Sequence, residues 1–288
     1  MRVKCRFFAA VVIFFVSRVP ADWPAGDAVM TRSFGFNDRG RPALGVIFEC
    51  RGDVPAAGGG EIIFSRSWGE TASRLPSPLG AWTAVDHGDG LVSVYSRYLD
   101  EPRNRQLTQV DRGDSVAIAG ASGWSRRDGF HYILFDRKER RWVNPAMVID
   151  PFPQVSLPQI QGIQLRNAQG RPVEGAQIRN LSQGRYTVAV NASDPVQVSG
   201  GRQYSPYRIV CSVNGAEAGT FSLETISARD GILMVNRDGL VPALQVYGPY
   251  PAYEVGDVFL SRGQAILEVI IQDITGNSRN ALTRILVE

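Results

Sequence analysis

Histidine and cysteine, which supply most zinc ligands, are scarce in this sequence. Its 288 residues include two histidines, His87 and His131, and three cysteines. Because a catalytic zinc needs three protein ligands with nitrogen, oxygen or sulfur donors, few zinc sites can be assembled from this composition. The sequence also has no Gly-x-Ser-x-Gly, no phosphate-binding loop and no Cys-x-x-Cys. It therefore lacks the short motifs of many serine hydrolases, nucleotide-binding proteins and thiol oxidoreductases.

Long apolar runs are scarce as well. The run near the N-terminus, Phe7 to Val16, follows a basic start and precedes a short Val-Pro-Ala segment. It is too short to span a bilayer, so residues 1–21 are predicted to be a secretory signal peptide, with the mature chain beginning near Asp22. A retained N-terminal anchor is the alternative. No other run of about 18 apolar residues occurs. We therefore expect no stable membrane insertion after cleavage, and a location in the periplasm or cell envelope.

Positive charge is scarce once that segment is removed. Residues 1–21 hold four basic residues and no acidic ones, so the formal net charge falls from +3 to −1. A chain of that charge has no electrostatic footprint for nucleic acid. The mature cysteines, Cys50 and Cys211, lie in different halves of the chain. Export would permit a disulfide between them, but the favoured interpretation is two free, buried thiols.

The sequence has instead many short apolar runs separated by turn residues, with 30 glycines and 17 prolines spread along it. No amphipathic helical pattern is sustained, so we expect an all-β protein. Prolines cluster at residues 151–158, which predicts a proline-rich linker between a first domain at 22–150 and a second at 159–288. About seven short strands are expected in the second domain, among them Gly184–Val190. This pattern is typical of an immunoglobulin-like β-sandwich.

The first domain contains five short sequence blocks. No single block is specific, and the information lies in the order in which they occur. They are Phe34-Gly35, Ala43–Ile47, Val54–Ile63, His87–Tyr98, and the stretch from Val110 to Pro145 that contains Phe130-His131-Tyr132 and Val143-Asn144-Pro145. In this order they resemble the lysostaphin-type (LytM-like) zinc metallopeptidases, which cut peptidoglycan cross-bridges. The resemblance covers about residues 32–150. It implies a lysostaphin-type β-sheet domain, barrel-sandwich-like in form.

The resemblance also indicates where a zinc site would be. In the family, the metal is held by the His and Asp of H-x-G-x-D and by the second His of H-L-H. Those positions correspond to Ala43, Ile47 and Ile133. None of these side chains has a donor atom, so the resemblance implies a degenerate member, a pseudoenzyme without zinc. Of the family's two further histidines, which act on the attacked carbonyl and its water, one is retained as His131 and the other is replaced by Arg97.

Three residues are therefore binding candidates: Tyr95, Arg97 and His131. Arg97 offers a permanent cation with a planar fork suited to a carboxylate. Tyr95 precedes it by two residues on one expected strand, so the two side chains should share a face. Each residue also has a plainer interpretation. Tyr95 would pack the sheet, Arg97 would be a solvated hairpin charge, and His131 would be a half-buried histidine bonded to backbone.

Three functions are left open by the sequence. The first is an exported envelope protein that binds peptidoglycan or regulates a wall hydrolase without catalysis, as the resemblance implies. The alternative is an active zinc metalloendopeptidase that cleaves peptidoglycan peptides with ligands at other positions, and zinc is expected in that case alone. The third is a structural envelope module that makes no contact with the wall.

Overall fold

The computed structural model describes residues 21–24, 28–67, 77–99, 107–150, 157–195, 203–248 and 251–288. In those ranges the chain is built almost entirely of β-strands, which confirms the all-β prediction. Short 3-10 helices lie between them: η2 (Pro145–Met147), η3 (Gly175–Arg179) and η4 (Ala243–Gln245). None of the described segments is a helix long and apolar enough to cross a membrane. Nearly all of the expected signal peptide, and residues 151–156 of the expected linker, lie outside the described ranges.

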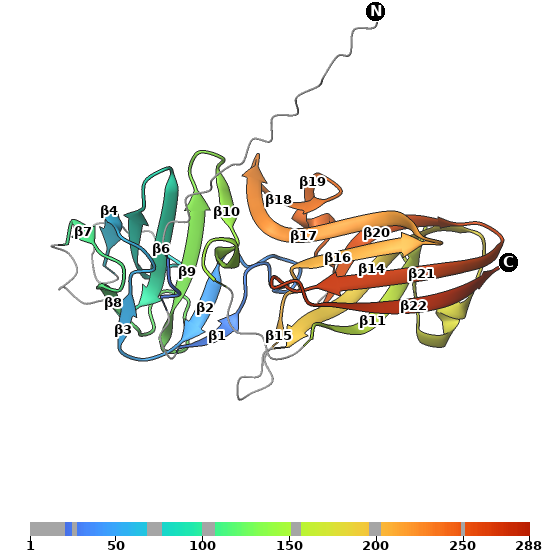
Figure 1. Ribbon diagram of the computed structural model, residues 1–288, viewed down its shortest axis with the longest axis horizontal. Helices are drawn as coiled ribbons and strands as arrows, with labels where there is room; N and C mark the ends of the chain where they lie inside the picture. The colour runs from blue at the N-terminus through green and yellow to red at the C-terminus, as the bar shows by residue number, and fades with distance from the viewer. Residues whose placement is uncertain are drawn as a thin grey trace, which may run out of the picture.

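The first domain, up to Asp150, is organised by an antiparallel sheet (Figure 1). Its strands follow the spatial order β7-β4-β5-β6-β9, and the far side of β9 pairs with β2 along one half and with β10 along the other. The described strands do not close into a barrel. β1 pairs with β2, and β3 and β8 form a separate pair. The bounds are β1 Val29–Arg32, β2 Val46–Glu49, β3 Asp53–Pro55, β4 Gly60–Arg66, β5 Ala81–Asp86, β6 Leu91–Tyr98, β7 Gln109–Val110, β8 Ser115–Ile118, β9 Gly129–Asp136 and β10 Arg141–Val143.

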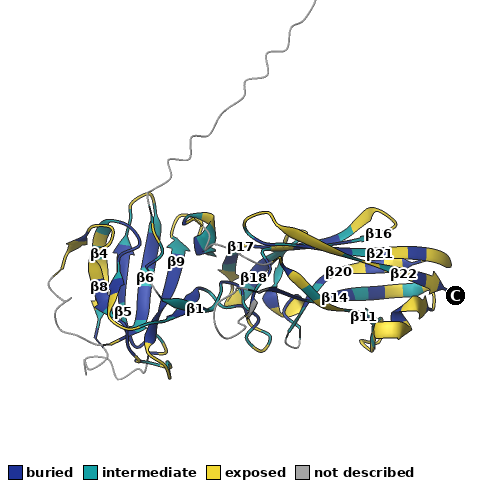
Figure 2. Cartoon of the chain, turned by 60° about the horizontal axis from the view of Figure 1, so that its bottom comes forward, coloured by how far each residue is buried: buried dark blue, intermediate teal, exposed yellow. Residues whose placement is uncertain are grey.

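The two faces of this sheet differ because side chains alternate along each strand. One face carries Phe48 of β2, Tyr95 of β6 and Phe130 and Tyr132 of β9, all of them fully buried. Figure 2 shows long stretches of β6 and β9 in the dark blue of buried residues. The Phe48 and Phe130 rings stack with centroids 5.0 Å apart, and Val54 of β3 belongs to the same core. Burying one Phe side chain contributes about 1.5–3 kcal/mol, so this face is held closed by several such terms. The candidate site lies on the opposite face.

The second domain, from Leu157 onward, consists of two sheets packed face to face. One has the order β12-β11-β14-β20, and the other contains β22-β21-β16-β17, with β18 and β19 beyond β17 and β13 beside β22. Leu165 and Val188 from the first sheet and Ile209 and Val269 from the second are completely buried between them. The bounds are β11 Gln159–Asn167, β12 Pro172–Glu174, β13 Asn180–Leu181, β14 Gly184–Pro195, β15 Gln203–Tyr204, β16 Arg208–Val213, β17 Ala216–Arg229, β18 Ile232–Arg237, β19 Leu240–Pro242, β20 Ala252–Leu260, β21 Gly263–Gln272 and β22 Ser278–Val287. This is a β-sandwich, and its assignment as immunoglobulin-like stays a prediction.

Local sequence explains how the strands of the sandwich reverse. Asn214-Gly215 joins β16 to β17, Asp230-Gly231 joins β17 to β18, and Asp238-Gly239 joins β18 to β19. Both residues of each pair have positive φ, for example 52° at Asn214 and 82° at Gly215. Asn, Asp and Gly tolerate this conformation best, and a tight hairpin with the twist of its strands requires it.

The two cysteines in the described part of the chain are free. Cys211 is buried in the core of the sandwich, where desolvation raises the pKa of its thiol to about 12. Cys50 is half-buried in the first domain, and burial raises its pKa as well. Both thiols are therefore protonated and unreactive at neutral pH, as expected of cysteines used for packing.

A shared sheet joins the two domains. β10 pairs with β9 on one side and with β17 on the other, and Trp142 of β10 lies opposite Ile226 of β17. Next to this pairing, the side-chain amide of Asn144 donates to the carbonyl oxygen of Leu223 at 2.9 Å. Gly35, with φ of 69°, packs so closely that a Cβ there would lie 2.5 Å from Leu223 Cδ2. A side chain at position 35 would be strained by this φ and would force the side chain of Leu223 to shift, so glycine suits this contact between the domains.

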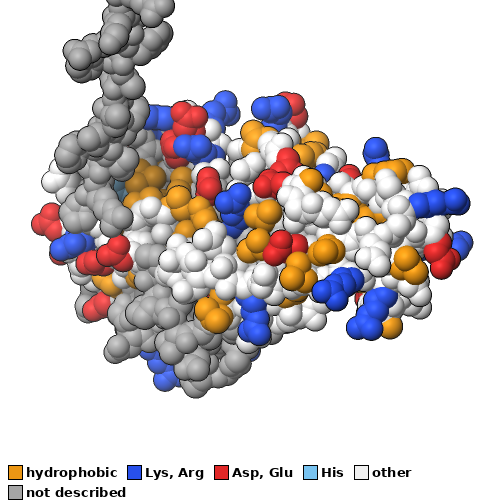
Figure 3. Space-filling view, turned by 45° about the vertical axis from the view of Figure 1, so that its right-hand side comes forward, with side chains coloured by type: hydrophobic (Ala, Val, Ile, Leu, Met, Phe, Trp, Pro, Cys, Tyr) orange, Lys and Arg blue, Asp and Glu red, His pale blue; other side chains and the backbone are white. Residues whose placement is uncertain are grey.

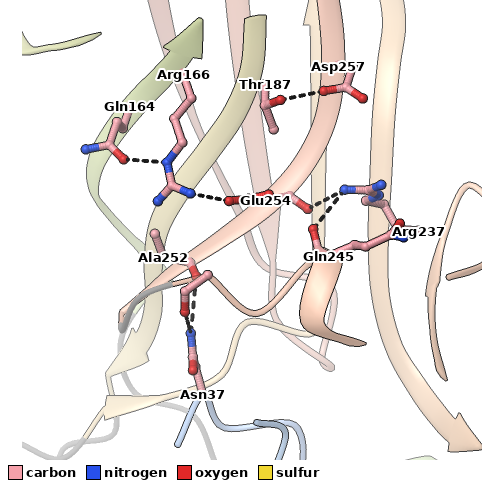
Figure 4. A network of polar contacts seen from close by, with 10 residues as sticks. Asn37, Gln164, Arg166, Thr187, Arg237, Gln245, Ala252, Glu254 and Asp257 are labelled. Atoms are coloured by element: carbon pink, nitrogen blue, oxygen red, sulfur yellow. Dashed lines mark hydrogen bonds and ion pairs between the residues drawn. The ribbon is translucent and has the colours of Figure 1, made fainter. Parts of the chain in front are cut away.

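Hydrogen bonds from buried groups close the same interface. Tyr204 donates to the carbonyl oxygen of Met30, and Tyr247 donates to that of Gly35, both at 2.9 Å. Asn37 donates from its side-chain amide to two backbone carbonyls of the second domain, at 3.2 and 3.3 Å; one of these contacts is drawn in Figure 4. Each such bond contributes about 0.5–1.5 kcal/mol net, and losing one partner of a buried bond costs more than that. The described residues outside the proline segment therefore hold the domains together by contacts of their own.

We expect the two halves to stay together after the chain is cut between them. A specific protease site placed within residues 151–156 would separate the covalent halves, while the β10–β17 pairing and the buried tyrosine bonds would remain. Cleaved protein should elute from gel filtration as one species at the volume of the intact chain. Gly35→Ala should release the halves, because its new methyl group collides with Leu223.

The matched control is Gly52→Ala, where φ is also positive, at 85°, but nothing lies within 4 Å of an added Cβ. It carries a similar backbone cost without the collision. Separation of the wild-type halves on cleavage, or equal behaviour of the two variants, would contradict the interface described above.

Candidate functional site

One row of residues crosses six strands on the partly exposed face of the first sheet. Cross-strand pairing places these residues opposite one another in the order Arg32 (β1), Ile47 (β2), His131 (β9), Ser96 (β6), Trp82 (β5) and Arg66 (β4). A parallel row lies two residues along: Ile133 (β9), Val94 (β6), Ala84 (β5) and Phe64 (β4). We call the face that carries these two rows the site face. It holds two of the three predicted binding candidates and two of the three expected ligand positions.

Two of the three expected ligand positions lie beside His131. Ile47 pairs directly with His131, and Ile133 follows it by two residues on the same side of β9. Ala43 lies just before β2, where its backbone N–H donates to the carbonyl oxygen of Phe36. Among the described residues, no group of three or more His, Cys, Asp or Glu side chains is placed to hold a metal ion. The residues around His131 therefore do not fit a zinc site.

His131 is buried and electrically neutral. Its side chain is 8% exposed, and burial, followed by the nearby charges of Arg97 and Arg32, lowers its pKa to about 3. Its Nδ1 is buried and has no hydrogen-bond partner within the described part of the chain. Gly45 makes room for the ring, since a Cβ there would lie 2.7 Å from His131 Nε2. A base with so low a pKa is a poor general base at neutral pH.

Arg97 reaches this region because the backbone is irregular at its position. Ala81 pairs with Tyr98 and Trp82 pairs with Ser96, so Arg97 is the extra residue of a β-bulge. Its φ is 66°, and its backbone N–H donates to the carbonyl oxygen of Leu79 at 2.8 Å. A bulge re-aims the side chain of its extra residue, and here it turns a cation out of the core side of the strand.

Two arginines and one carboxylate set the charge near His131. Burial lowers the pKa of Arg97 first, then repulsion by Arg32, while Asp38 opposes the shift. Arg32 is paired with Asp38 at 2.7 Å and lies over the ring of Phe36 at 5.6 Å. The Nε of Arg97 is buried without a hydrogen-bond partner among the described residues. The region therefore favours an anion, and the two arginine charges, which add to the effect of burial on the pKa of His131, disfavour a zinc cation.

Tyr95 packs the sheet, as its plainer interpretation expected, and does not share a face with Arg97. Its side chain is 0% exposed, and its hydroxyl accepts a hydrogen bond from the backbone N–H of Ala57 at 2.7 Å. Its ring lies 5.3 Å from that of Tyr132, and burial raises its pKa to about 12. Tyr95 therefore belongs to the core face. It cannot share a face with Arg97, because strict alternation along β6 fails at the bulge.

Sequence reasoning missed Arg32, Phe64, Arg66 and Trp82 as members of the site face. The side chains of Phe64 and Trp82 stack with ring centroids 4.3 Å apart and planes 23° from parallel. Phe64 is 47% exposed, which is unusual for a Phe in a sheet. Alternation within Gly60–Arg66 puts Phe64 and Arg66 on one side of the strand, which the sequence alone could have predicted. The sequence could not have predicted that this strand pairs with β5, which brings Phe64 next to Trp82.

No curated protein sequence matches the chain. A family model matches residues 157–288, the second domain, without a description of function. Solved structures similar to the chain are M23 and lysostaphin peptidases, matched at low identity. The M23 protein EnpA of an Enterococcus faecalis prophage, a mutant of its catalytic domain, is 23% identical, covers 41% of this chain and 87% of its own, and gives a TM-score of 0.34.

Two further structures lie in the same range. The catalytic domain of the antimicrobial peptidase lysostaphin from Staphylococcus simulans is 19% identical, with 39% of this chain and 83% of its own covered and a TM-score of 0.33. A zinc-containing peptidase from Vibrio cholerae is 23% identical, with 42% of this chain and 36% of its own covered and a TM-score of 0.32.

His131 should make the protein lose stability in mild acid. Unfolded histidine binds a proton near pH 6.5 and folded His131 only near pH 3, so between these values the unfolded state holds the extra proton. Stability is then fully present above about pH 6.5 and falls as the pH drops toward 3, by at most about 1.4 kcal/mol per pH unit. Urea unfolding at pH 7, 6, 5 and 4 measures this slope.

In that experiment His131→Gln should flatten the slope relative to wild type, since the carboxylates common to both proteins cancel in the difference. If His131→Gln and wild type lose stability in parallel, His131 is not the buried neutral group described here.

Proposed function

We propose that this chain is an exported cell-envelope protein whose first domain lacks zinc and binds peptidoglycan or a peptidoglycan hydrolase through the site face. The observation that carries the proposal is the environment of His131. Isoleucines stand at two of the three expected ligand positions beside it, and two arginines, Arg32 and Arg97, make the region suited to an anion. Stem peptides of the wall carry carboxylates, as do acidic patches of protein partners.

Arg97 is the residue on which binding should depend. Its guanidinium presents a planar fork that matches a carboxylate, and it is half-buried, so a bound ligand would exclude water from the contact. An exposed contact of this kind contributes about 1 kcal/mol, and more where water is excluded. Loss of the side chain therefore weakens binding at least about fivefold.

Arg97→Ala should reduce the binding of whichever partner uses the site face. Co-sedimentation with isolated sacculi measures binding to peptidoglycan, and recovery of a hydrolase from envelope extract measures binding to a protein partner. The matched control is Arg140→Ala. Arg140 is exposed in the turn between β9 and β10 and has φ of 54°, close to the 66° of Arg97. Both changes replace one side chain by another with a Cβ, so backbone strain is held constant. Equal recovery of ligands by Arg97→Ala, Arg140→Ala and wild type would remove the site face from the mechanism.

The alternative is an active zinc metalloendopeptidase that cleaves peptidoglycan peptides. It requires ligands other than Ala43, Ile47 and Ile133, because those side chains have no donor atoms. Elemental analysis of the purified mature protein should find far less than one zinc per chain. One zinc per chain, lost on His131→Gln and accompanied by release of peptides from sacculi, would establish the alternative and overturn the proposal.

A further inference from the structure

The long outer strand of the second domain has a free edge. β22 lies at the border of its sheet, with β21 on one side (Figure 1). On the other side, β13 pairs with Leu286 and Val287 alone among the residues that the structure describes. Residues 278–285, which we call the free edge, therefore have no neighbouring strand there in the described chain. At about 3.3 Å per residue the free edge is about 26 Å long, which is enough to pair with a strand of ordinary length.

Backbone hydrogen-bonding groups of the free edge point away from the sheet at every second residue. The N–H of Glu288 donates to the carbonyl oxygen of Leu181, and the carbonyl oxygen of Glu288 accepts from Gln183, so Glu288 faces away from β21. Because the direction alternates along an antiparallel strand, every second residue before Glu288, back to Ser278, faces the same way. Between Ser278 and Arg284 these groups meet no other backbone in the described part of the chain. Such a row of N–H and C=O groups is a template for one more strand.

An apolar cluster lies beside the free edge. Leu282 is 63% exposed and stands opposite Glu268 of β21. Its diagonal neighbours on β21, Ile266 and Ile270, share the outward face and are 44% and 36% exposed. Apolar side chains are scattered among charged ones over the visible surface of the second domain (Figure 3), so exposure alone does not mark a binding site. Here the exposed side chains adjoin free backbone groups, and one added strand would cover both.

Charge decides which kind of strand fits the free edge. It carries Arg279 and Arg284, which point to opposite faces of β22, and it carries no acidic residue. Both arginines are exposed and belong to none of the ion pairs between described residues. Glu268, the acidic residue of β21, accepts a hydrogen bond from the side-chain amide of Asn280 at 3.3 Å. A second copy of this chain would bring two more arginines to the edge, so repulsion disfavours self-pairing, and an acidic strand is favoured instead.

We propose that the free edge of β22 takes one added strand from an extended, acidic segment of a partner protein. In this mode of recognition, backbone hydrogen bonds supply affinity and the side chains on alternate positions supply selectivity. Leu282 and Arg284 share the outward face, so the segment places an apolar residue and an acidic residue two positions apart on that face. The free edge belongs to the second domain and uses no residue of the site face, so this inference goes beyond the proposed function.

Designed peptides test the inference on the mature full-length protein. The acidic probe is a nine-residue peptide with Val and Glu alternating along one face and Thr along the other, and the basic probe has Lys in place of each Glu. Fluorescence polarisation should show the acidic probe binding about tenfold more tightly than the basic probe. Hydrogen exchange should slow at the N–H groups of Asn280, Leu282 and Arg284 when the acidic probe binds. It should change little at Ala281 and Thr283, whose N–H groups already face β21.

Variants of the free edge separate its backbone from its charge. Leu282→Pro removes one outward N–H and should weaken binding of the acidic probe about tenfold, while the ladder with β21 keeps its bonds. Leu282→Ala keeps that N–H and should weaken binding less. Arg284→Glu should reverse the preference, so that the basic probe binds more tightly than the acidic one. Its matched control is Arg229→Glu, the same change of charge at an exposed arginine of β17, which should keep the wild-type preference.

Urea unfolding is measured for each variant, and Arg284→Glu decides the question if Leu282→Pro unfolds. The inference fails if wild type binds neither probe, binds both equally, or binds the acidic probe without protecting the three outward N–H groups. It also fails if ultracentrifugation shows a dimer that Leu282→Pro separates, because the free edge would then hold a second copy. Each of these results leaves the proposed function standing, since that function is measured by sacculi and hydrolase binding of Arg97→Ala.

Discussion

The pairing of β6 with β9 is the constraint on which the rest of the first domain depends. Placing Tyr95 opposite Tyr132 buries both rings in the core, and the same register places Ser96 opposite His131 on the other face. A shift by one residue would bring the tyrosines to the surface and the histidine into the core. The cost of exposing two buried aromatic rings therefore fixes where the site is. Function at this face is positioned by packing on the opposite one.

Positive charge beside His131 determines which ligands this site can accept. A zinc ion needs donors that are neutral or negative, and it draws electron density from its ligands. Beside His131 the chain has isoleucines and two guanidinium groups instead, and the charges of those groups add to burial, the larger cause, in lowering the pKa of the histidine. An arrangement that repels a proton from His131 also repels a divalent cation. It attracts a carboxylate, and Asp38, paired with Arg32, leaves the charge of Arg97 to an incoming ligand.

Features of the fold and of the site that depend on a short stretch of sequence could be predicted. Alternating runs and Asn-Gly turns gave the all-β class and the hairpins of the sandwich, and the order of short blocks brought Ile47, His131 and Ile133 to one face. Tyr95 was misplaced because nothing in the sequence marks Arg97 as the extra residue of a bulge. The bulge depends on the pairing of β5 with β6. The stack of Phe64 on Trp82 and the pairing of β10 with β17 likewise arise from contacts between distant segments, which alternation within one strand does not specify.

The shared sheet fixes the orientation of the second domain relative to the site face. His131 lies on β9, β9 pairs with β10, and β10 pairs with β17 of the sandwich, so three adjacent strands connect the site to the second domain. A domain on a flexible tether would raise the local concentration of a second binding surface over a wide volume. A domain fixed by sheet pairing and buried tyrosine bonds holds one orientation instead, and a ligand bound at the site face meets the sandwich at a set angle or not at all. Any joint recognition by the two domains is therefore a matter of geometry, and a change at the interface such as Gly35→Ala would impair it without touching either surface.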